Sequence, residues 1–153
     1  MSAEARIKEL GITLPQPPKP VGNYVPGVRV GSLLFLSGHG PSRVDGPPAA
    51  RGKVGRDLST EDGYKVARDV GINLLGSARA LLGSLDKVKR IVKVLGMVNS
   101  AEGFGDQPKV INGFSDLMVE VFGENGRHAR SAVGMAELPM GIPVEIEMIL
   151  EVE

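Results

Sequence analysis

Residues 130–153, RSAVGMAELPMGIPVEIEMILEVE, decide the fold of this chain. Over residues 144–153 every even-numbered residue is apolar, and every odd-numbered residue except Ile149 is acidic. This period-two alternation predicts a β-strand with one buried face and one face toward water or a partner. A second short apolar run covers residues 131–136, and residues 138–143 supply the Pro and Gly of a turn. We therefore expect the two arms to pair antiparallel as a hairpin.

Two charged residues mark this predicted hairpin. Arg130 stands at the start of the first arm, and Glu145 stands just past the turn. Antiparallel pairing would bring this cation and this carboxylate toward the same end, which makes them a candidate site. From the residues alone, a solvated arginine and an acidic strand face that serves solubility are the commoner meanings, and they stay open.

The composition predicts one domain over residues 1–153. A chain of 153 residues with 42% hydrophobic content can bury one core, whereas two domains of this total length would each be marginal. Eighteen Lys and Arg side chains balance eighteen Asp and Glu side chains, which argues against a nucleic-acid partner. The chain has no cysteine, and this excludes disulfides, thiol nucleophiles and thiolate metal sites.

The distribution of apolar residues predicts a soluble protein of the cytoplasm. No run approaches the roughly 18 apolar residues that a membrane-spanning helix needs. The first twenty residues mix charges with apolar side chains and contain no apolar core of signal-peptide length. We therefore expect no membrane partner.

The first third of the chain contains short elements and a long loop. A short helix over residues 3–10 and a Pro-rich extended segment at 15–20 predict an N-terminal arm, residues 1–20. Residues 28–36 predict two short strands about a tight turn. Residues 42–58 are rich in Pro and Gly and show no period, so we expect an extended loop.

Two helices flank a central strand in the middle of the chain. Ser59 and Asp62 resemble a capping box, and apolar residues follow the helical period from there to Leu85. A second helix is expected between Asp106 as N-cap and Gly123. The β-branched run 89–98 predicts the strand between them. The order of elements predicts an α+β fold, with two helices packed on one face of a mixed β-sheet.

Separated landmarks in the sequence resemble the RidA family, also called the YjgF family. Its C-terminal signature is matched, in order and spacing, by Arg130-Ser131, Leu138-Pro139 and Val144-Glu145-Ile146-Glu147. Its early Tyr, its strand ending in Ser-Gly and its helical Asn are matched by Tyr24, Ser37-Gly38 and Asn112. The chain has His39 where the family commonly has Gln, and the arm 1–20 and loop 42–58 exceed the family core. These departures indicate a divergent branch.

The resemblance implies a chorismate-mutase-like fold, a homotrimer and sites in the clefts between subunits. It also implies a hydrolase, a deaminase that converts reactive 2-imino and enamino acids to 2-keto acids and ammonia without a cofactor. Carried over by position, Arg130 would hold the substrate carboxylate and Glu145 would position or activate water. The residues implied to line the pocket are Tyr24, Ser37 and Asn112, with His39 in place of the family amide.

The residue types suit this chemistry. The planar fork of an arginine binds a carboxylate through two parallel hydrogen bonds. A carboxylate that titrates near neutral pH can take a proton from water and later pass one on as ammonia leaves. Burial would raise the pKa of Glu145 and Arg130 would lower it, and the sequence leaves this balance open.

Other functions use some of the same residues. A non-catalytic protein that senses a small carboxylate, such as a 2-keto acid, would use the same Arg130 pocket. A ribonuclease or translation inhibitor has less support, because the charge is balanced and no basic or aromatic platform stands out. A Ser37–His39 nucleophile lacks a third orienting group. His39 and His128 have no carboxylate partners at a recognised spacing, so no metal site is expected.

Overall fold

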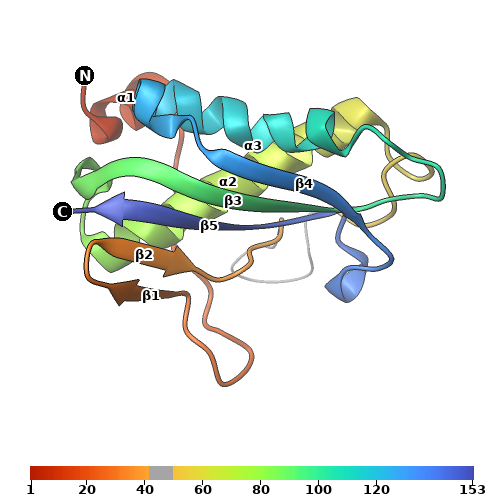
Figure 1. Cartoon of the computed structure of the whole chain (residues 1–153), viewed down its shortest axis with the longest axis horizontal. Helices are drawn as coiled ribbons and strands as arrows, with labels where there is room; N and C mark the ends of the chain where they lie inside the picture. The colour runs from red at the N-terminus through yellow and green to blue at the C-terminus, as the bar shows by residue number, and fades with distance from the viewer. Residues whose placement is uncertain (42–49) are drawn as a thin grey trace.

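The computed structural model describes residues 1–41 and 50–153 of the chain (Figure 1). Five strands form one sheet in the order β1-β2-β5-β3-β4. The strands are β1 Gly27–Val30, β2 Leu33–Leu36, β3 Val88–Asn99, β4 Ala129–Met135 and β5 Val144–Val152. Neighbouring strands are antiparallel except β3 and β4, which are parallel. The sheet is therefore mixed, as predicted.

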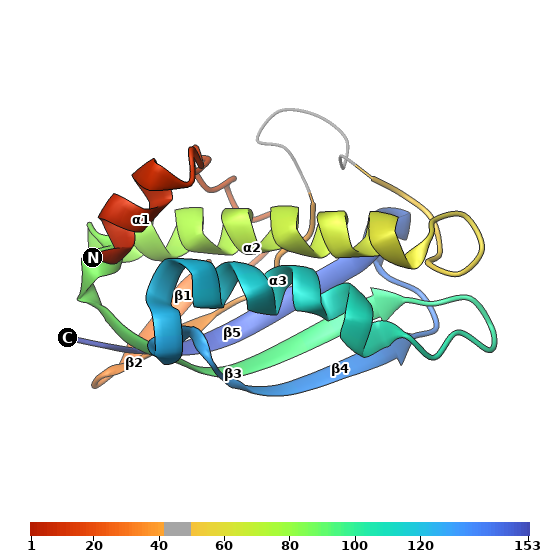
Figure 2. The same ribbon diagram turned by 90° about the horizontal axis from the view of Figure 1, so that it is seen from above.

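The helices form a second layer. They are α1 Ala3–Glu9, α2 Thr60–Leu82 and α3 Gln107–Phe122, and short 3-10 turns occur at η1 Leu85–Lys87, η2 Gly123–Gly126 and η3 Pro139–Gly141. Figure 2 shows α2 and α3 side by side over one face of the sheet. The other face carries no helix in the part of the chain that the structure describes, and we call it the open face. The predicted α+β fold, with two helices on one face, is confirmed.

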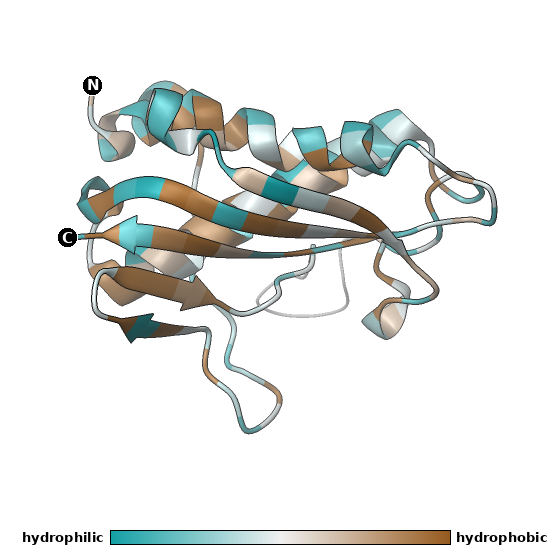
Figure 3. Cartoon of the chain, in the orientation of Figure 1, coloured by the Kyte–Doolittle hydropathy of each residue, from teal (hydrophilic) through white to brown (hydrophobic). Residues whose placement is uncertain are grey.

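The alternating pattern of β5 sorts its side chains between the two layers. Its even-numbered residues are at most 1% exposed, namely Val144, Ile146, Met148, Leu150 and Val152. They pack against the apolar stripe of α2 in the same core to which α3 contributes, and each such side chain contributes roughly 1.5–3 kcal/mol to folding by its burial. Figure 3 shows the hydrophobic colour along β2 and much of β5. The odd-numbered residues, including Glu145, consequently lie on the open face.

The predicted hairpin of the last two strands is wrong. β4 and β5 do not pair with each other, because β3 lies between them and pairs with both. The backbone N–H of Asn99 at the end of β3 donates to Pro143 O at 2.9 Å, and its side chain Nδ2 donates to Ile142 O at 3.2 Å. The β4–β5 connection thus crosses the end of β3. Turn residues and alternation mark where strands begin and end, but they do not say whether a third strand comes between.

The predicted ends of most elements agree with the structure. α3 begins after Asp106 and ends before Gly123, and the two strands about the turn at residues 31 and 32 are present as β1 and β2. α2 ends at Leu82, before the predicted Leu85, because Gly83 adopts a left-handed conformation with φ 84° and caps the helix.

The N-terminal arm packs on the domain through α1. Glu4 accepts a hydrogen bond from the backbone N–H of Leu85 at 2.9 Å, and Arg6 Nε donates to Glu120 O at 2.9 Å. Figure 1 shows the segment before β1 as a loop that projects beyond that strand. Of the predicted loop 42–58, residues 42–49 lie outside the described residues. In the remainder, Val54 forms isolated bridges with Leu58 and Ser100.

Candidate functional site

Arg130 is held by α3. Its Nη1 donates to Asn112 Oδ1 at 2.8 Å and to Ser115 Oγ at 3.0 Å. These two acceptors are three residues apart on a helix, so they project from the same side one above the other. Arg130 is in register with the buried Val94 of β3, which places its side chain on the helix-facing side of the edge strand β4. The predicted site residues Arg130 and Asn112 are therefore brought together.

The arginine is oriented but not neutralised. A guanidinium has five N–H donors, and the two on Nη1 go to neutral acceptors. Within residues 1–41 and 50–153, neither Nε nor Nη2 of Arg130 has a hydrogen-bond acceptor, and no carboxylate forms an ion pair with Arg130. The Nε–Nη2 edge is the one that can bind a carboxylate through two parallel hydrogen bonds.

A pocket of about 270 Å³ lies beside this arginine. It is lined by Asn112, Ser115, Asp116, Val119, Arg127, His128 and Arg130. Asp116 accepts a hydrogen bond from Tyr64 Oη at 2.7 Å, and Arg127 Nε is paired with Glu124 at 3.1 Å. The pocket can therefore accept a small anion at Arg130.

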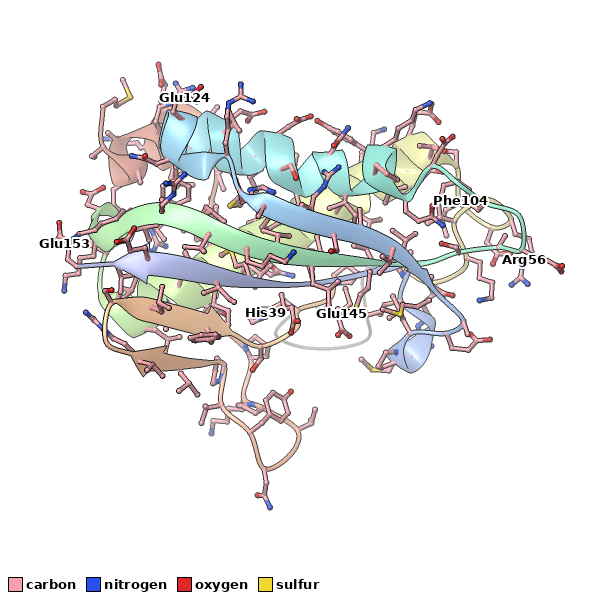
Figure 4. The ribbon with its side chains drawn as sticks, in the orientation of Figure 1. His39, Arg56, Phe104, Glu124, Glu145 and Glu153 are labelled. Atoms are coloured by element: carbon pink, nitrogen blue, oxygen red, sulfur yellow. The ribbon has the colours of Figure 1, made fainter. Side chains whose placement is uncertain are left out.

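Glu145 lies on the open face, near the start of β5 (Figure 4). Burial raises the pKa of its carboxyl group, and the negative charge of Glu147 raises it further. Arg130 is not among the groups that shift this pKa, so the lowering expected from the sequence does not operate within one chain. A carboxylate whose pKa is raised toward neutrality is suited to take up and release protons.

A bulge in β2 positions Ser37 and Gly38 beside Glu145. Phe35 pairs with Ile149 and His39 pairs with Ile146, so the β2 side has one residue more than the β5 side between these pairs. A bulge lets two consecutive residues lie on the same side of a sheet. A Cβ on Gly38 would be 2.6 Å from Glu145 Oε2, so only glycine leaves the carboxylate in this position.

Ser37 connects this region to the segment that carries Tyr24. Its Oγ donates to Val25 O at 2.6 Å, and its backbone N–H donates to Pro26 O at 2.9 Å. Tyr24 is next in the chain and is 52% exposed, so its ring is available to a ligand or to another molecule. The predicted residues Ser37 and Glu145 thus share one region, with Tyr24 at its margin.

His39 faces the helices. Its Nδ1 lies 2.6 Å from Ser37 O and its Nε2 lies 2.7 Å from Ser77 Oγ on α2. Burial lowers the pKa of this imidazole, whereas the hydrogen bond to Ser37 raises it to a lesser extent. Figure 4 shows His39 beside Glu145, yet its ring is bonded to α2 behind the sheet. In this position His39 contacts the backbone of the bulge and not the space in front of Glu145.

The predicted residues thus form two groups on opposite faces of the sheet. Arg130 and Asn112 form a cation group on the helix side of β4, whereas Ser37 and Glu145 form an acid group on the open face. The expectation that Arg130 and Glu145 meet at one end of a hairpin fails because β3 separates their strands. Within one chain these two groups therefore do not form one site.

Two residues of the cation group were not predicted from the sequence. Ser115 bonds Arg130, and His128 Nε2 lies 2.9 Å from Ser115 Oγ. The spacing of Asn112 and Ser115 on one side of a helix was the signal that could have indicated Ser115. Among residues 1–41 and 50–153, no group of three or more His, Asp or Glu side chains could hold a metal ion. No helix in these residues is long and apolar enough to cross a membrane.

The sequence of this chain matches a family of known proteins. Residues 4–148 match a family model described as "YjgF/chorismate_mutase-like, putative endoribonuclease". Protein TCP17 of Trypanosoma cruzi is 43% identical over 148 residues, which cover 96% of this chain and 92% of that protein. A 2-iminobutanoate/2-iminopropanoate deaminase of Dermatophagoides farinae is 31% identical over 144 residues, 93% of this chain and 95% of that one.

The fold is also similar to solved structures. A crystal structure of a protein of unknown function from Agrobacterium tumefaciens superimposes with a TM-score of 0.88 at 44% sequence identity. The match covers 98% of this chain and 91% of that chain.

Proposed function

Because the chain belongs to the YjgF/RidA family, we propose that it is a hydrolase that converts reactive 2-imino and enamino acids to 2-keto acids and ammonia. One observation carries the proposal. The half-buried Arg130 is oriented by two neutral side chains, and no described carboxylate neutralises it. The deaminase of D. farinae, at 31% identity, supports the same reaction class.

In this proposal Arg130 holds the substrate carboxylate. Its Nε–Nη2 edge forms two parallel hydrogen bonds with the carboxylate, which fixes the orientation of the substrate as well as its charge. Asn112 and Ser115 prepare this geometry before the substrate arrives, so less side-chain freedom is lost on binding.

Glu145 acts as the base and then as the acid. The substrate reacts as the imine protonated on nitrogen. The Glu145 carboxylate takes a proton from water as the oxygen adds to the imine carbon, which gives a neutral carbinolamine. The protonated Glu145 then passes this proton to the nitrogen, and the carbon–nitrogen bond breaks with release of ammonia. The Glu145 carboxylate takes up the hydroxyl proton as the carbonyl of the 2-keto acid forms, and it later gives this proton to water. An enamine enters this sequence after it tautomerises to the imine. Ser37 orients the water, and Tyr24 closes the pocket.

The cation group and the acid group lie on opposite faces, so a site that contains both Arg130 and Glu145 requires another copy of the chain. In a homotrimer the open face of one subunit meets β4 and α3 of the next, and Glu145 of one copy serves Arg130 of its neighbour. The open face carries the exposed apolar side chains Val28, Val30, Phe35 and Val133. Exposed apolar side chains on one face of a sheet are typical of a protein–protein contact.

The remaining assignments stay predictions. His39 serves the pocket by holding the backbone of the bulge through Ser37 O. The cytoplasmic location, the absence of a cofactor and the single domain over residues 1–153 were expected from the sequence and the family.

A direct assay tests the proposed function. An amino acid oxidase generates the imine of a small amino acid, and release of the 2-keto acid is followed with and without the protein. We expect the wild type to accelerate release and Arg130→Ala to lose most of this effect. Equal rates with both proteins would contradict the proposal. Tight binding of 2-ketobutanoate without turnover would instead identify a carboxylate sensor that uses the same Arg130.

The pH dependence of the reaction should respond to Glu147. Replacing Glu147 by Gln removes the second cause of the raised pKa of Glu145, so this pKa falls toward its ordinary value. A base must be ionised to act, so the acidic limb of the kcat/KM profile should move to lower pH. Burial still holds the pKa above the ordinary value, so the shift is partial. Glu151→Gln on the same strand and face is the control, and an unmoved limb in Glu147→Gln would contradict Glu145 as the base.

A further inference from the structure

The guanidinium of Arg130 is connected through Ser115 to the imidazole of His128. Arg130 Nη1 donates to Ser115 Oγ at 3.0 Å, and this oxygen lies 2.9 Å from His128 Nε2. On its other side, His128 Nδ1 lies 2.7 Å from Gly126 O in η2. The four groups thus form an unbroken chain of hydrogen bonds from η2 to the candidate carboxylate clamp.

The chemistry of these groups fixes the direction of every bond. A backbone carbonyl only accepts, so the proton of a neutral imidazole must lie on Nδ1 and point to Gly126 O. Nε2 then presents a lone pair, and the hydroxyl of Ser115 donates its single proton to it. The lone pairs of Ser115 Oγ are consequently available to Arg130. Every donor in the chain meets an acceptor, and neighbouring bonds in such a chain polarise and strengthen one another.

The surroundings of His128 favour this neutral form. Burial lowers the pKa of the imidazole, the hydrogen bond to Gly126 raises it, and the charge of Arg130 lowers it. The ring meets Phe114 of α3 edge to face, with centroids 5.7 Å apart and planes at 64°. The other charged residues around this pocket are Asp116 from α3 and Arg127 from the segment before β4.

We propose that Ser115 and His128 are positioning residues, which hold Arg130 with its Nε–Nη2 edge toward the ligand and so set the affinity for the carboxylate. The inference rests on the proposed role of Arg130 as the carboxylate clamp. An arginine side chain has large rotational freedom, which a ligand would otherwise have to restrict when it binds. The hydrogen-bond chain imposes this order in advance, and neither of its two residues touches the reacting carbon.

Substitutions distinguish a positioning role of Ser115 and His128 from a role in the chemical step. Ser115→Ala and His128→Leu should each raise KM for the imine and Kd for 2-ketobutanoate about tenfold, since each breaks the same chain. Their kcat values should stay within about twofold of the wild type. The Kd of the double variant should be no higher than that of either single variant, because the two residues act through the same chain of hydrogen bonds. His128→Gln keeps an acceptor toward Ser115 and should restore most of the affinity.

The tautomer of His128 provides a test that needs no activity. The chain has two histidines, so a ¹⁵N NMR spectrum of the wild type shows two imidazoles, and a His39→Gln variant assigns them. At pH 7.5 His128 should be neutral and protonated on Nδ1. Protonation on Nε2, or a charged ring at this pH, would overturn the inference, as would an unchanged Kd in Ser115→Ala.

These readouts distinguish failure of the inference from failure of the proposed function. If the wild type binds 2-ketobutanoate but turns over no imine, the deaminase proposal fails and the Kd series still decides the role of Ser115 and His128. If the wild type neither binds 2-ketobutanoate nor hydrolyses the imine, the role of Arg130 as a carboxylate clamp is refuted. The proposed effect of Ser115 and His128 on affinity is then refuted as well.

Discussion

Replacing Glu145 by Gln should lower kcat for imine hydrolysis by roughly 10²- to 10⁴-fold, the usual contribution of a positioned general base. Gln has nearly the same shape and fits beside Gly38, but its amide cannot take a proton from water. Binding of 2-ketobutanoate should change little, because the carboxylate of this ligand is held by Arg130. The measurement is a pair of values, kcat from keto-acid release and Kd from calorimetry.

Stability gives an independent control for this variant. Burial raises the folded-state pKa of Glu145 above its unfolded value, so the ionised carboxylate destabilises the fold at neutral pH. This cost disappears as the pH falls through the raised pKa, and it disappears at all pH values with Gln. The thermal midpoint of Glu145→Gln at pH 7.5 should therefore not be lower than that of the wild type. A variant that keeps wild-type kcat while folded would exclude Glu145 as the base.

Replacing Arg130 by Ala should raise Kd for 2-ketobutanoate by roughly 100-fold, or about 3 kcal/mol, since the ligand carboxylate loses its charged partner. Arg130→Lys should recover part of this loss, because an ammonium supplies charge but lacks the fork of the guanidinium. KM for the imine should follow the same order. The effect on kcat should be smaller than that of Glu145→Gln, since Arg130 binds the ground state and the transition state alike.

Arg127 offers a matched control for Arg130. It lines the same pocket, but its guanidinium is already paired with Glu124 and is more exposed. Arg127→Ala should change Kd by less than threefold, as expected for a screened surface charge. Equal losses in Arg127→Ala and Arg130→Ala would mean that the pocket attracts anions by general charge, and the specific clamp would be refuted.

The sequence predicted the local elements because each has a local cause. Asp106 and Gly123 bracket α3, and the alternation in β5 sorts its residues between the core and the open face. These signals lie within one turn or one strand, where neighbouring side chains decide the backbone conformation. The order of these elements and the family resemblance then predicted the α+β, chorismate-mutase-like fold, which the mixed sheet with helices on one face confirms.

The relation of Arg130 to Glu145 could not be predicted in the same way. It depends on β3, a strand about 30 residues earlier in the chain, which lies between β5 and the edge strand β4 and pairs with both. Residues 130–153 would show the same local sequence pattern whether β4 and β5 paired directly as a hairpin or were separated by β3. The contacts of His39 with Ser77 and of His128 with Ser115 are likewise long-range or depend on side-chain direction, and no spacing in the sequence encodes them.

The central claim is that one site takes Arg130 from one copy of the chain and Glu145 from another. Arg130→Ala and Glu145→Gln chains, each with only a small fraction of the wild-type kcat/KM alone, can be co-expressed with different tags and purified through both. Every mixed trimer then contains one interface where an intact Glu145 meets an intact Arg130, so we expect about one third of the wild-type rate. A mixed preparation no more active than the two variants alone would show that the site is not shared between copies.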